Sequence, residues 1–124
     1  MKALIVVLSC CISACAAQVS STRLGTMSDF APTPDSVNIP IYATTVPTCA
    51  YDEVASISAE IAMTRGADER VTESLRQRAR ALGGQTIIAY RQDTRDLVVS
   101  RGQAVTELRR NGIAIRFRSQ DCQH

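Results

Sequence analysis

DERVTESLRQRARALGGQTIIAY, residues 68–90, predicts a helix, its end and a buried strand in one continuous stretch. The helix prediction depends on one apolar stripe with i, i+4, i+8 and i+11 spacing, formed by Val71, Leu75, Ala79 and Leu82. Acidic residues occupy the early turns and arginines the late turns, which suits the helix dipole. Asp68 is the expected N-cap, and Gly83-Gly84 ends the helix at the C′ position.

Two strand patterns precede this helix in the sequence. Residues 53–62, EVASISAEIA, alternate, with Ala55, Ile57, Ala59 and Ile61 on one face. Residues 37–42 also alternate, but Pro40 cannot donate a hydrogen bond to a neighbouring strand. The sequence therefore predicts a half-buried strand over 53–62 and an edge strand over 37–42.

The C-terminal part is less regular. Residues 85–90, QTIIAY, form a short apolar strand, and the charged run 91–96 predicts a turn or loop. Residues 97–99 suit a strand, 103–110 are ambiguous, and Asn111-Gly112 is a turn signal. Residues 113–117 alternate, with Ile113, Ile115 and Phe117 expected inward. The pattern predicts a small α+β domain over 37–124, with a mixed or antiparallel sheet of about four strands and one principal helix packed on one face.

The N-terminus, MKALIVVLSCCISACAAQ, has the order of a secretory signal. One lysine precedes a ten-residue apolar run, which is too short to span a bilayer, and small residues follow. Residues 12–15, ISAC, resemble a lipoprotein cleavage box that ends in the lipidated Cys15. We therefore expect a signal peptide over 1–14 and acylation of Cys15. The alternative is ordinary cleavage after Ala16, within the A-x-A pattern.

Residues 15–36 are rich in Ser, Thr, Ala and Pro and show no period, so they predict a lipidated cysteine followed by a flexible tether. Several acyl chains on Cys15 would hold the protein stably at a membrane. By analogy with lipoprotein sorting, Ala16 after the cysteine favours the outer membrane, facing the periplasm. A soluble periplasmic protein is the alternative.

Composition excludes one class of partner. After removal of the signal, 13 arginines stand against 12 acidic residues, so the net charge is +1 and nucleic-acid binding has no electrostatic basis. Arginine binds phosphate or carboxylate in a bidentate manner. Arg76, Arg80, Arg109 and Arg110 are the candidate patch for an anionic ligand or partner, and a solvated helix face is the alternative.

Cys49 and Cys122 are the two cysteines left after signal removal and lipidation. In an oxidising compartment such a pair predicts one disulfide. The alternative is a metal site that adds Asp121 and His124, although the paired C-x₂₋₄-C spacing of zinc sites is absent. Ser56 and Ser58 have no histidine to activate them, and His124 is the last residue. We therefore predict no catalytic residues, no cofactor and no enzyme activity.

YDEVASIS, ERVTESLRQRARALGGQTIIAY and GIAIRF together give the chain a resemblance to small envelope lipoproteins. Over residues 37–117 it resembles the enterobacterial Rcs envelope-stress sensor lipoproteins and a family of small domains named for heavy-metal binding. This resemblance implies a lipid-anchored, disulfide-stabilised domain that binds another envelope protein. The stress sensors have two disulfides, whereas this chain can form only one.

Two function classes follow from these observations. The first is a non-enzymatic interaction module, anchored by lipid and facing the periplasm, which takes part in stress sensing or assembly. The second is a small periplasmic carrier of a ligand or metal.

Overall fold

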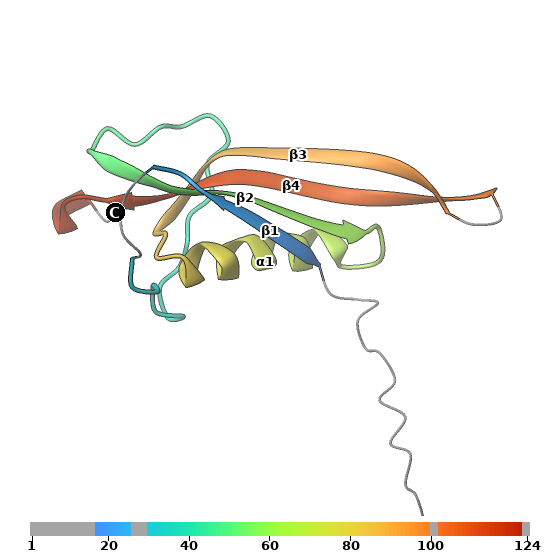
Figure 1. Ribbon diagram of the computed structural model, residues 1–124, viewed down its shortest axis with the longest axis horizontal. Helices are drawn as coiled ribbons and strands as arrows, with labels where there is room; N and C mark the ends of the chain where they lie inside the picture. Colours follow the sequence, from blue (N-terminus) through green and yellow to red (C-terminus); the bar gives the residue numbers. More distant parts are fainter. Residues whose placement is uncertain (1–16, 26–29, 100–101, 123–124) are drawn as a thin grey trace, which may run out of the picture.

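A four-stranded antiparallel sheet with one helix on one face forms the protein, which confirms the predicted α+β class (Figure 1). The computed structural model describes residues 17–25, 30–99 and 102–122. The strand order is β1-β2-β4-β3. The elements are β1 (Gln18–Arg23), β2 (Tyr51–Ala62), α1 (Ala67–Ala81), β3 (Thr86–Val99), β4 (Gln103–Phe117) and the short 3₁₀ helix η3 (Gln120–Cys122).

Helix α1 packs on β2 through the two faces that the sequence predicts. Its buried residues are Ala67, Val71, Leu75 and Ala79, and those of β2 include Ala55, Ile57, Ala59 and Ile61. Gly83, at φ 84°, follows the C-cap residue Leu82, so the predicted helix end is confirmed. The predicted N-cap is wrong, because Gly66 occupies that position and Asp68 lies two residues later, in the first turn of the helix.

The predicted turn at Asn111-Gly112 is also wrong, because both residues lie within β4 and pair with β2. Position 112 requires glycine because there is no room for a side chain. A Cβ at this position would collide with Cγ2 of Ile87, which is fully buried between the sheet and the helix. The connection between β3 and β4 instead falls at 100–102, where Gly102 has φ 72°.

The charged run 91–96, predicted as a turn or loop, belongs to β3. A β-bulge precedes it, because Ala89 and Tyr90 together lie opposite Gly112 and the register shifts between Ile88 and Arg91. Ala89 has φ 52°, the left-handed conformation that lets the strand continue after the bulge. Because β3 continues past the bulge, it forms with β4 a long ribbon that extends beyond α1 (Figure 1).

Strand β4 has buried residues on both of its faces, whereas the sequence predicted one inward face. The register pairs Ala55, Ile57 and Ile61 with Ala114, Gly112 and Leu108, so the even-numbered residues of β4 face α1. Ile115, expected inward, is fully buried, but on the face opposite α1 together with Ile88. Residues 43–50 cross on that side of the sheet (Figure 1). The sheet thus buries apolar residues on both faces, so alternation in β4 alone did not identify the helix side.

The N-terminal boundary also needs correction. Residues 18–23 belong to the segment predicted as a flexible tether, yet they form β1 and pair with β2 from Gln18 opposite Glu60 to Arg23 opposite Ala55. The folded domain therefore begins near residue 18 rather than 37. The edge strand predicted over 37–42 is reduced to one parallel bridge, between Ile41 and Ile87.

We expect Gly112→Ala to lower the free energy of unfolding by about 1–3 kcal/mol, because the new methyl group must displace Ile87 from a closed core. Urea denaturation followed by circular dichroism measures this change. The control is Ala62→Val at the exposed end of β2, which should change stability by less than about 0.5 kcal/mol. Equal effects of the two substitutions would contradict the role assigned to Gly112.

Candidate functional site

The predicted disulfide joins Cys49, just before β2, to Cys122 in η3. The two Cα atoms lie 6.1 Å apart and the cysteines are 73 residues apart in sequence. The bridge ties the C-terminus to the segment that crosses the sheet beside Phe117. A shallow hollow here is lined by Tyr42, Val46, Pro47, Phe117 and the disulfide. Both sulfur atoms are therefore committed to a covalent bond and are not available as metal ligands.

The four candidate arginines do not form the predicted patch. Arg76 and Arg80, on α1, both bind Glu73, at 3.5 and 3.3 Å. The Nε atom of Arg76 donates to the carbonyl of Ile39, and that of Arg80 donates to the carbonyl of Val37. These two side chains hold the chain segment between β1 and β2, so both of them serve the fold.

Arg109 and Arg110 are consecutive in β4 and point to opposite faces of the sheet. Arg109 binds Glu60 of β2 at 3.0 Å. Arg110 is 6% exposed and faces α1, where it donates to Asp68 at 2.6 Å and to the carbonyls of Asp93 and Arg109. Arg110 therefore joins the first turn of the helix to the base of the β3–β4 ribbon. Burial among hydrogen-bond acceptors makes it a structural residue rather than a surface anion site.

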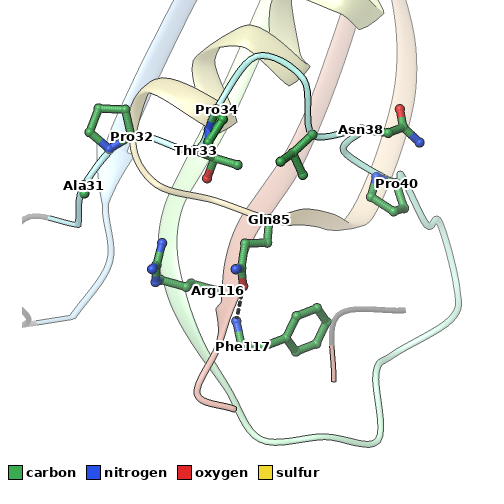
Figure 2. Close-up of a pocket in the computed structure, with 10 residues that line it drawn as sticks. Ala31, Pro32, Thr33, Pro34, Asn38, Pro40, Gln85, Arg116 and Phe117 are labelled. Carbon is green, nitrogen blue, oxygen red and sulfur yellow. Dashed lines mark hydrogen bonds between the residues drawn. The ribbon is translucent and has the colours of Figure 1, made fainter. Parts of the chain in front are cut away.

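A cleft of about 370 Å³ opens at the end of the sheet where β4 finishes and β3 begins. In Figure 2, Pro34 and Pro40 lie along one side, and Arg116, Gln85 and Phe117 lie along the other. We call this the proline cleft. The remaining lining residues are Ala31, Pro32, Thr33, Val37 and Asn38.

Hydrogen bonds and packing fix the start of the wall formed by residues 30–40 to the end of α1 and to the glycines that follow it. The backbone N–H of Thr33 donates to Arg80 O at 2.8 Å, and its hydroxyl donates to Gly84 O at 2.7 Å. Gly83 lies against Phe30, since a Cβ there would stand 2.5 Å from the Cβ of Phe30. The cleft is consequently a built feature of the fold, with one wall that the sequence predicted to be part of a tether.

Polar groups occupy the opposite wall of the proline cleft. The guanidinium of Arg116 lies 5.2 Å from the ring centroid of Phe30 and donates to the carbonyl of Gly83 at 3.1 Å. The Oε1 atom of Gln85 accepts the N–H of Phe117 at 2.8 Å, as the dashed line in Figure 2 shows. A guanidinium and a side-chain amide beside proline rings suit an extended peptide that carries a carboxylate.

Sequence reasoning missed the proline cleft and Arg116. Pro32, Pro34 and Pro40 were the available signal, because three prolines within nine residues favour an extended, preformed wall. Their meeting with the end of β4 depends on long-range hydrogen bonds, which periodicity does not reveal.

In the part of the chain that the structure describes, no group of three metal-binding side chains occurs, and no helix has the length and apolar character needed to cross a bilayer. Cys15 and His124 lie outside the described residues. Lipidation of Cys15 therefore stays a prediction.

We expect reduction of the disulfide to lower the free energy of unfolding by about 4 kcal/mol, the chain-entropy value for a loop of this length. Urea denaturation with and without reductant gives the difference. The Cys49→Ser, Cys122→Ser double variant is the control and should match the reduced protein whether or not reductant is present. A wild-type protein whose stability does not respond to reductant would contradict this prediction.

We expect Asp68→Asn to lower stability by about 1–2 kcal/mol, because it removes the charged partner of the buried Arg110. Glu69→Gln is the matched control, since it removes one charge from the same helical turn and should cost less than about 0.5 kcal/mol. The comparison is made by urea denaturation at low salt. Equal losses would show that helix-dipole effects, rather than the ion pair, account for the change.

Comparisons with known proteins bear on the fold alone. No family model and no curated protein matches the chain. A protein of unknown function of the DUF74 family from Pediococcus pentosaceus is 14% identical, with a TM-score of 0.50 over 64% of this chain and 97% of its own. The Francisella virulence factor FvfA is 12% identical, with a TM-score of 0.51 over 83% of this chain and 99% of its own. These likenesses support the architecture and leave the resemblance to envelope-stress lipoproteins a prediction.

Proposed function

We propose that the protein is a lipid-anchored, non-enzymatic binding module of the bacterial envelope, facing the periplasm and presenting the proline cleft to another envelope protein. The observation that carries this proposal is the placement of the cleft at the end of the sheet remote from the expected anchor. The resemblance to envelope-stress lipoproteins implies the same class of partner. A role in stress sensing or in assembly is part of the proposal.

The positions of anchor and cleft follow from strand register. Gln18, three residues after Cys15, pairs with Glu60 near the end of β2. Arg116, in the wall of the cleft, pairs with Asp52 near the start of β2. Eight strand residues separate the two places, which is about 26 Å at the usual rise per residue. A chain held at Cys15 would therefore present the proline cleft away from the lipid surface.

The disulfide supports the proposed location outside the cytoplasm. A stable bridge between Cys49 and Cys122 suits an oxidising space outside the cytoplasm, which agrees with the signal sequence at residues 1–14. It also fixes residues 43–50 next to Phe117, one of the residues that line the cleft.

A periplasmic carrier remains the second candidate, in a changed form. A carrier of metal could not use Cys49 and Cys122 as ligands, because they are bonded to each other. The small-ligand version is favoured by the volume of the proline cleft and by the adjacent Arg116 and Gln85. A small carboxylate with an apolar body would suit the same groups.

The anchor is tested first by the intact mass of the protein purified from its own envelope fraction. We expect a mass that begins at Cys15 and includes acyl chains. A mass without lipid would instead point to a soluble periplasmic protein.

The partner is tested by a photo-crosslinking amino acid at Asn38, which is exposed at the cleft rim. We expect an adduct with one envelope protein in intact cells, and we expect Arg116→Met to reduce its yield because the guanidinium is removed while an apolar side chain remains. The control carries the same crosslinker at Gln92, an exposed residue of β3 outside the cleft. Adducts that form equally at both positions, or that ignore Arg116→Met, would count against the cleft as the binding site.

A further inference from the structure

The β3–β4 ribbon carries one apolar cross-strand pair on each face beyond the last contact with β2. Strand β2 ends with Ala62 opposite Glu107, and the N–H of the next residue, Met63, donates to Thr106 O, so residues 97–99 and 103–105 continue as two strands alone. Leu97 pairs with Val105 on one face, and Val98 pairs with Ala104 on the other. Val98 is 81% exposed, the largest value among the exposed large hydrophobic residues of the described chain. We call these four residues the ribbon end.

Polar contacts hold the base of this ribbon together. Arg95 binds Glu107 across the two strands at 3.0 Å, and Thr106 donates to Asp96 at 2.8 Å. These charged pairs lie nearer the domain than the four apolar residues of the ribbon end, and Arg101 follows in the connection between the two strands. The distance from Glu107 to the start of β4 at Gln103 is about 14 Å at the rise of an antiparallel strand.

The ribbon end and the expected lipid anchor lie at the same end of the sheet. Chain length limits the separation of the Cα atoms of Cys15 and Gln18 to about 10 Å. Gln18 pairs with Glu60, only two residues before β2 ends at the base of the ribbon. Figure 1 shows the ribbon projecting beyond α1 on the side where β1 begins.

We propose that the ribbon end enters the interfacial region of the bilayer that holds the acylated Cys15 and gives the domain a second membrane contact. This inference rests on the proposed lipid anchor. Apolar area at the headgroup boundary stabilises such contacts, and the Arg95 guanidinium at the base can remain among the headgroups.

Lipid explains the two-sided character of the ribbon end better than a protein does. A protein partner that packs on one face leaves the pair on the other face in water, whereas lipid surrounds both faces. The depth is limited, because the outer backbone groups of a two-stranded ribbon have no strand partners and are costly to place in hydrocarbon. The ribbon end therefore reaches the interface and does not span the membrane. Two attachments, at Cys15 and at the ribbon, would fix the orientation of the domain.

The test uses Val98→Trp in the full-length acylated protein, because the chain contains no tryptophan and the reporter is therefore unique. The protein is incorporated into vesicles of phosphatidylethanolamine and phosphatidylglycerol, with or without brominated acyl chains. We expect a blue shift of the emission and loss of intensity in brominated vesicles. Val46→Trp is the control, since Val46 is 62% exposed in the segment before the disulfide and should keep its emission in both vesicles.

The intact mass of each sample separates the two levels of the proposal. An unacylated protein would refute the proposed anchor. An acylated protein whose Val98→Trp emission is unaffected by brominated lipid would refute membrane contact by the ribbon while leaving the anchor in place. Equal quenching at both reporters would also refute it, because the domain would then have no fixed orientation. A blue shift without quenching would show that the ribbon end contacts protein instead.

Discussion

The side chain of Ile87 over the bare backbone of Gly112 is the contact on which the arrangement of this domain depends. It lets β3 pair closely with β4 on the helix side of the sheet. The backbone N–H of Ile87 donates to Pro40 O, and its carbonyl accepts the N–H of Tyr42. The same residue thus secures the sheet and the irregular segment beside it. Because the bulge follows within two residues, β3 then turns into the projecting ribbon.

Most of the described arginine side chains for which contacts are resolved serve the fold. Arg76 and Arg80 bind backbone carbonyls of residues 37–39, and Arg110 joins the ribbon base to the helix. The core of this domain is small, and its short segments have little apolar packing. Charge-assisted hydrogen bonds to the carbonyls of these segments stabilise them instead. Arg116 differs, because its contacts with Gly83 and Phe30 leave it in the wall of a cleft.

The fold has two functional ends in this interpretation. One end carries the start of β1 and the ribbon, and the other carries the proline cleft and the disulfide. Antiparallel pairing produces this separation directly, since the start of β1 lies beside the end of β2 while the end of β4 lies beside its start. A rigid sheet would therefore hold the start of β1, next to the proposed anchor, about 26 Å from the proline cleft without a long linker.

The sequence by itself determined the helix, its glycine end, the buried face of residues 53–62, the α+β class and the cysteine pair. These are local properties: helical and strand periods, the conformational freedom of glycine, and a count of thiols. Only the tertiary structure decided the rest. Residues 18–23 are polar and become a strand because β2 offers them an open edge, and residues 91–96 continue a strand because a bulge redirects it. Taken with its sequence neighbours alone, Gly112 predicts a turn. The side chain of Ile87, 25 positions earlier in the chain, nevertheless requires glycine in the middle of β4. The proline cleft likewise depends on hydrogen bonds between segments distant in sequence, which no local pattern encodes.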